Sequence, residues 1–125
     1  MIRDEATDGL NVAIKALREA RKKLEIVIGQ KEADDMDYDE ESYEVDNINA
    51  RLMTLRKRKA LLDNSNDNAI LGAPSPSDIQ SVKNYILTVQ QLTLDIAMTQ
   101  AGLKMIIDLA HQGIALGTDV EMKPA

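Results

Sequence analysis

Few residues in this chain have the types and the spacing that chemistry requires. The single histidine, His111, follows Asp108 by three residues, so both side chains would lie on one face of a helix. Metal sites in helical bundles use such carboxylate–histidine pairs, but they take one pair from each of two helices. Because this chain holds half of that ligand set, we expect an ordinary helical histidine.

A second pattern resembles a calcium loop. Asp35, Asp37, Asp39 and Asp46 stand at positions 1, 3, 5 and 12 of such a loop. However, position 6 is Glu40 where the loop needs glycine, and position 12 would normally be a glutamate that binds through both oxygens. We therefore predict no specific calcium site, no other metal and no cofactor.

Composition excludes several further classes of chemistry. The chain of 125 residues has no Cys, which rules out a disulfide framework, a thiolate metal site and a cysteine nucleophile. It contains no glycine-rich phosphate loop and no nucleophile-elbow motif. We expect that the protein is not an enzyme.

Charge and hydropathy restrict the partners and the compartment. A formal net charge of -6, no Trp and no Phe disfavour a nucleic-acid partner. The polar first residues lack the apolar segment of a signal peptide, which predicts a cytoplasmic protein, with export without a cleavable signal peptide left open. The stretch over residues 84–103 has Asp95 as its only formal charge, yet it is too polar for a lipid-facing helix, so no membrane span is expected.

Three segments carry apolar residues at steps of three and four, which predicts an all-α fold. The expected elements of a single helical domain over residues 1–125 are a helix over 7–30, an acidic turn over 31–40, a helix over 40–62, a loop over 63–76, a helix over 76–116 and a short tail to 125. We expect an elongated, coiled-coil-like three-helix bundle, in which a helical hairpin packs on one long C-terminal helix.

The third segment has the clearest start and the most apolar surface. Ser75 is placed as N-cap, Pro76 as the first helical residue and Asp78 as an acidic third residue. An uninterrupted helix from there would be roughly 57 Å long and apolar on two faces. One of these faces holds Leu87, Leu94, Met98, Met105 and Leu109. Either the two shorter helices flank this rod on both sides, or a partner covers the face.

A second candidate surface is the acidic tract between the first two helices. Its candidate partner-binding residues are Asp34, Asp35, Asp37, Tyr38, Asp39, Glu40 and Glu41. Such a cluster can steer association with a basic protein surface. The alternative is a solubilising turn followed by a helix start, where acidic residues are favoured.

These patterns together favour a non-catalytic protein–protein interaction module. It would act as an inhibitor, an immunity-type antidote, a chaperone or an adaptor, through helical surfaces and the acidic segment. The alternative is a self-assembling coiled-coil subunit of a larger complex, such as a secretion or phage assembly. The partner is accordingly another protein, with a basic surface, or the chain itself in a homo-oligomer.

Overall fold

The computed structural model describes residues 2–124, and its elements confirm the all-α class. In chain order they are α1 (Ile2–Ala33), α2 (Asp39–Asp63), a 3-10 turn η1 (Asp67–Ala69), β1 (Ile70–Gly72), α3 (Pro76–Gln90), α4 (Leu94–Ala97), α5 (Gln100–Thr118) and β2 (Glu121–Met122). Four of the helices are long and make the bundle, whereas α4 is a single turn.

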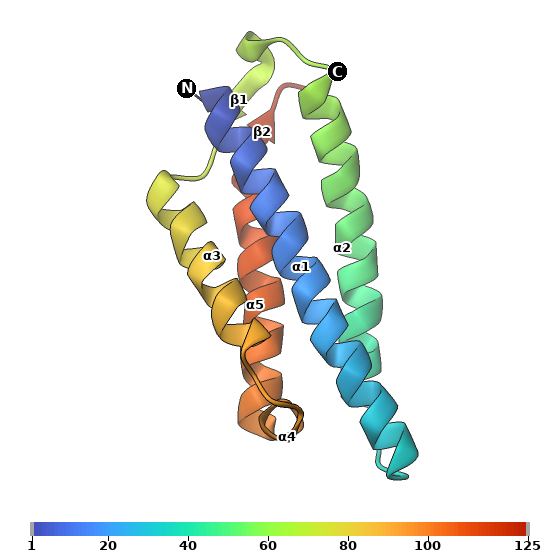
Figure 1. Cartoon of the computed structure of the whole chain (residues 1–125). Coiled ribbons are helices and arrows are strands. Elements are labelled where there is room, and N and C mark those ends of the chain that lie inside the picture. The colour runs from blue at the N-terminus through green and yellow to red at the C-terminus, as the bar shows by residue number, and fades with distance from the viewer. Residues whose placement is uncertain (1, 125) are drawn as a thin grey trace.

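The long helix α1 is the centre of the arrangement. It packs against α2, α3 and α5, and it forms with α2 an antiparallel hairpin (Figure 1). The chain then descends along α3 and returns through α5. β1 and β2 pair antiparallel, with Ile70 opposite Met122, at the end of the bundle where both termini lie. The turn between α1 and α2 therefore projects at the opposite end.

The first helix is longer than its sequence pattern suggested. It begins at Ile2 rather than near residue 7, and it continues to Ala33 rather than ending near residue 30. Acidic residues in its first turn suit the positive end of the helix dipole, and Ala6 is already fully buried. Tertiary packing thus extends the helix beyond the expected cap. The second helix, Asp39–Asp63, lies close to the range predicted for it.

The prediction of one continuous helix over residues 76–116 was wrong. The Ser75 hydroxyl does accept a hydrogen bond from the Asp78 amide at 3.0 Å, as expected, but the helix ends at Gln90. Two threonines then cap new helices: Thr93 Oγ1 accepts from the Ile96 amide, and Thr99 Oγ1 accepts from the Gly102 amide at 3.0 Å. The expected rod is therefore folded back on itself, and the apolar face predicted from Leu87 to Leu109 is divided between α3, α4 and α5.

Small residues let α1 and α5 approach closely. The contact face of α1 is rich in alanine, and an added Cβ at Gly113 would stand 3.1 Å from the Ala13 carbonyl oxygen. At Gly117 an added Cβ would collide with Leu55 of α2. Gly117 is thus a packing residue inside α5, which continues to Thr118.

Three cationic side chains close the C-terminal ends of helices other than their own. Arg3 Nη1 donates to the Leu62 carbonyl at the end of α2, at 3.0 Å. Lys23 Nζ donates to the Leu92 carbonyl just beyond α3, at 2.7 Å. Arg58 Nη1 donates to Gly117 near the end of α5, at 2.9 Å. These cations satisfy carbonyls that a helix leaves unpaired and oppose the negative end of its dipole.

We expect the substitution Lys23→Met to lower the free energy of unfolding by about 1–2 kcal/mol, because the Leu92 carbonyl would lose a charged donor. Urea denaturation followed by circular dichroism measures this change. Lys22→Met is the matched control, since Lys22 is exposed and forms no ion pair within residues 2–124. Equal midpoints for the two variants would remove the capping role.

Candidate functional site

The acidic residues predicted to bind a partner gather at the projecting end of the α1–α2 hairpin. We call residues 32–46 the acidic tip; they comprise the end of α1, the turn over 34–38 and the first turns of α2. The exposed carboxylates are those of Glu32, Asp34, Asp35, Asp37, Asp39, Glu40 and Asp46. No Lys, Arg or His occurs in these fifteen positions, and none of these exposed carboxylates forms an ion pair within residues 2–124.

Local hydrogen bonds hold the turn of the acidic tip in one shape. Asp35 has φ of 60°, a left-handed conformation that Asp tolerates better than most residues. The Met36 amide donates to the Lys31 carbonyl at 2.7 Å, and Asp37 Oδ1 accepts from the Asp39 amide at 3.0 Å. The carboxylates are therefore carried on an ordered helical hairpin.

Glu41, one of the predicted partner-binding residues, is occupied within the fold. It is 2% exposed, and its Oε2 lies against the Lys31 ammonium of α1. This buried ion pair ties the two helices together where they leave the turn. Tyr38 is half-buried, so it is only partly available to a partner.

Two apolar side chains at the acidic tip were not among the predicted site residues. Met36 is 47% exposed in the turn, and Tyr43 is 68% exposed on the second turn of α2. Such side chains supply contact area at protein interfaces, where Tyr and Met are enriched. The sequence signal was their position inside an acidic stretch, away from the apolar stripe of either helix.

The predicted apolar face of the third segment is not one surface, because the helix breaks within it. Leu87 is 56% exposed on α3. Leu94, Met98 and Met105 are half-buried, and the first two pack against the core. Leu109 is fully buried in α5. The helices of the chain itself thus cover most of the surface for which a partner was expected.

A cluster of cations, here called the basic face, lies on the outer side of α1 and α2. Its members are Lys15, Arg18, Lys22, Arg56 and Lys57, all exposed and, within residues 2–124, without an acidic ion-pair partner. An open hollow of about 900 Å³ runs along α1 here, and it shares Arg21 with a smaller hollow between α1 and α2.

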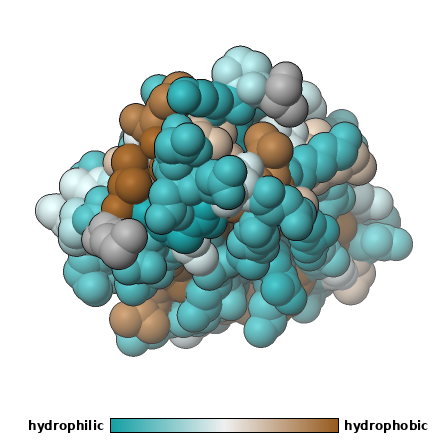
Figure 2. Space-filling view, turned by 90° about the horizontal axis from the view of Figure 1, so that it is seen from above, coloured by the Kyte–Doolittle hydropathy of each residue, from teal (hydrophilic) through white to brown (hydrophobic). Residues whose placement is uncertain are grey.

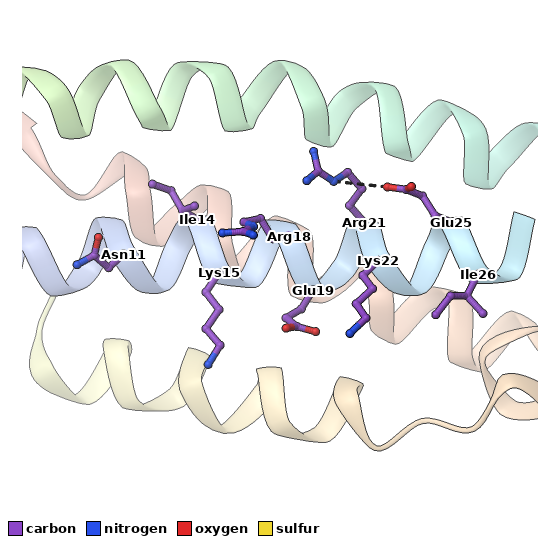
Figure 3. A pocket seen from close by; sticks show the side chains of 9 residues that line it. All are labelled: Asn11, Ile14, Lys15, Arg18, Glu19, Arg21, Lys22, Glu25 and Ile26. Atoms are coloured by element: carbon purple, nitrogen blue, oxygen red, sulfur yellow. Dashed lines mark ion pairs between the residues drawn. The ribbon is translucent and has the colours of Figure 1, made fainter.

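Figure 3 shows how the side chains of this hollow are arranged. Arg21 and Glu25 extend toward α2, and their side chains form an ion pair at 3.5 Å. Lys15, Glu19 and Lys22 extend toward α3. Arg56 and Lys57 line the neighbouring hollow, on the side of Arg21 that faces α2.

The end of the bundle that carries the sheet has a third candidate surface. Figure 2 views this end and shows brown apolar side chains separated by teal polar ones. Leu61 and Leu71 are exposed there, and both line an open hollow with Met122. Lys57, Arg58 and Lys123 interrupt the apolar lining, so it forms no continuous patch.

The aspartate–histidine pair singled out for chemistry lies apart from these surfaces. Asp108 is half-buried and His111 is exposed on α5, and no group of three or more potential metal ligands occurs in the described part of the chain. Burial, together with the nearby charge of Asp108, raises the pKa of the Tyr85 phenol above its usual value of 10.0, so this phenol is neutral at pH 7. Among residues 2–124 no helix has both the length and the hydropathy to cross a bilayer.

Comparison with protein-family models, with curated proteins and with solved structures gives no match to this chain. The residues themselves therefore carry the functional argument.

Proposed function

We propose that this chain is a non-catalytic protein-binding module that recognises a basic protein surface through its acidic tip. The single observation that carries the proposal is the concentration, on an ordered helical hairpin, of exposed carboxylates that form no ion pair within residues 2–124, with Met36 and Tyr43 exposed among them. Inhibitor, antidote, chaperone and adaptor are the uses that such a module serves.

Electrostatics explains what the carboxylates would do. A patch of one sign raises the local concentration of an oppositely charged partner and accelerates the encounter, by as much as 10- to 1,000-fold at low salt. Charge alone gives weak discrimination, because exposed ion pairs contribute little to affinity. The apolar side chains of Met36 and Tyr43 supply area that becomes desolvated on docking.

The ordered shape of the acidic tip supports recognition as well as attraction. Because the turn is hydrogen-bonded and Lys31 and Glu41 join the helices directly behind it, a partner meets a nearly rigid surface. A rigid surface loses little conformational freedom on binding, which favours affinity.

We expect neutralisation and reversal of the tip charges to slow partner association by at least tenfold at low salt and to flatten its salt dependence. The tip variant is Asp34→Lys, Asp35→Asn, Asp37→Asn and Asp39→Lys. Asparagine is chosen at 35 because it tolerates the left-handed conformation, and at 37 because its oxygen can still accept from the Asp39 amide. Biosensor association rates, measured against the basic proteins that the wild type captures from its native cells, test this expectation.

The matched control changes the same total charge away from the tip, as Asp4→Lys, Asp95→Asn, Asp119→Asn and Glu121→Lys, all at exposed positions. Its association rates should stay within about twofold of the wild type, since the carboxylates of the acidic tip are unchanged and distant charges are screened by salt. If both variants bind at the wild-type rate, the acidic tip is not the recognition surface.

The alternative function, a self-assembling subunit, is favoured by a different observation. The same molecule carries a basic face whose sign is opposite to that of the tip. Two copies therefore offer each other complementary surfaces, and the geometry of that pairing is developed next.

A further inference from the structure

We propose that two copies of this chain form an antiparallel dimer in which the acidic tip of each copy docks on the basic face of the other. This inference names the partner of the acidic tip, and it therefore rests on the proposed function. It follows from the order in which charged and apolar side chains succeed one another along α1 and α2.

One stripe along the outer side of α1 is exposed from end to end. Its residues succeed one another at steps of three and four, which places them on one helix face. They are Asn11, Lys15, Arg18, Lys22, Ile26, Gly29 and Ala33. Cations come first, the apolar and small residues Ile26, Gly29 and Ala33 follow, and the acids of the tip come last.

The second helix has the same order of side chains along its own length, but its middle lies level with the cations of α1, since Arg21 meets Asn49. Because α2 runs antiparallel to α1, Asp46 lies toward the tip, Asn49 and Met53 lie in the middle, and Arg56 and Lys57 lie at the far end. A hydrogen bond of 2.9 Å from Arg21 Nη1 to Asn49 Oδ1 holds the two helices in this register. The cations of α1 and those of α2 thus line two neighbouring hollows that share Arg21.

A pattern that runs from basic through apolar to acidic is complementary to its own reverse. When a second copy is turned end over end, its acidic tip faces the basic face of the first, and its basic face meets the tip of the first. Arg18 and Asp34 are sixteen residues apart, roughly 24 Å along the axis. The two-fold axis would pass midway between them, close to Ile26, which is 48% exposed.

This arrangement uses one surface twice and closes on itself, so it gives a discrete dimer rather than a filament. The overlap from residue 13 of one copy to the turn of the other is about 24 residues, or roughly 36 Å, across two helices about 20 Å wide. That is roughly 700 Å² per partner, close to the ~800 Å² of a standard stable interface. Ile26 of each copy supplies an apolar contact at the centre, with the ion pairs on both sides.

Paired variants test the charge pattern directly. The face variant is Lys15→Glu, Arg18→Glu and Lys22→Glu, and its partner is the tip variant defined above. We expect the wild type to sediment as a dimer at low salt and to dissociate as salt is raised. Each variant alone should be monomeric, because like charges would then meet across the interface. An equimolar mixture of the two variants should restore a dimer, since every tip would again face a surface of opposite sign.

A cysteine at the proposed axis tests the geometry, and the chain contains no other cysteine that could interfere. Ile26→Cys should give a reducible covalent dimer under mild oxidation, because the two copies of residue 26 would face each other. Leu87→Cys is the matched control: Leu87 is similarly exposed and apolar but lies on α3, so it should stay monomeric. Circular dichroism of each variant confirms that it is folded.

A wild type that stays monomeric at low salt and at 1 mM protein overturns the dimer, as does a dimer that both variants and salt leave unchanged. Either result leaves the proposed function standing, because capture of a foreign basic protein by the tip is measured separately. Conversely, a face variant that binds a foreign partner normally while the tip variant does not supports the proposed function whatever the fate of the dimer.

Discussion

Replacing Gly102 with alanine is expected to lower the free energy of unfolding by about 3 kcal/mol, at the upper end of what overpacking costs. A Cβ at this position would stand 2.0 Å from the Ile96 carbonyl oxygen and 2.9 Å from the Ala97 Cα, both atoms of the backbone. A flexible side chain could turn aside, but here the whole of α4 must move away from α5. Urea denaturation measures the loss.

Gly29→Ala is the matched control, and its effect should have the opposite sign. An added Cβ at Gly29 would meet nothing within 4 Å, and the residue lies inside α1. Alanine is a better helix former than glycine, so we expect a gain of about 0.5–1 kcal/mol. Destabilisation of both variants by the same amount would mean that the crowding at Gly102 is not what matters.

Breaking the buried ion pair behind the acidic tip is the second change with a large expected effect. Lys31→Met should lower the free energy of unfolding by about 3 kcal/mol, because it leaves the carboxylate of Glu41 buried without its counter-charge. Chemical denaturation at pH 7 and constant protein concentration gives the value. The loss should be much larger than that for Glu25→Gln, which breaks only the exposed Arg21–Glu25 pair.

The double variant Lys31→Met with Glu41→Leu separates the pair from the cost of an uncompensated charge. Since both ionic groups would be replaced by apolar ones, most of the lost stability should return. If the loss of unfolding free energy in the double variant equals the sum of the losses in the two single variants, the two residues act independently and the ion pair contributes no coupling.

The sequence was sufficient for features that depend on local patterning. Apolar residues spaced three and four positions apart identified the helical segments. The combination of Ser75, Pro76 and Asp78 located the start of α3. The break at residues 91–99 was not foreseen because no glycine or proline marks it, and Thr93 also fits the apolar stripe. The break is made by the Thr93 and Thr99 caps, by the Lys23 ammonium of α1 and by the close approach of α4 to Gly102. The contacts of Lys23 and Gly102 are visible only in the folded structure.

The part of the candidate site that is contiguous in sequence could be predicted, whereas the part that depends on contacts between helices could not. The acidic tip is contiguous in sequence, so its charge could be read directly from residues 32–46. The burial of Glu41 could not, because it depends on Lys31 from the preceding helix. The basic face was missed entirely, because its cations come from two helices whose register only the fold sets.

The capping of one helix by a cation from another affects how the protein unfolds. Arg3 and Lys23 of α1 close the ends of α2 and α3, and Arg58 of α2 closes the end of α5. A fragment that holds α3 to α5 alone would lose both of the cations that close its helix ends, so we do not expect that fragment to be stable. Melting should be a single cooperative event, with every element lost together.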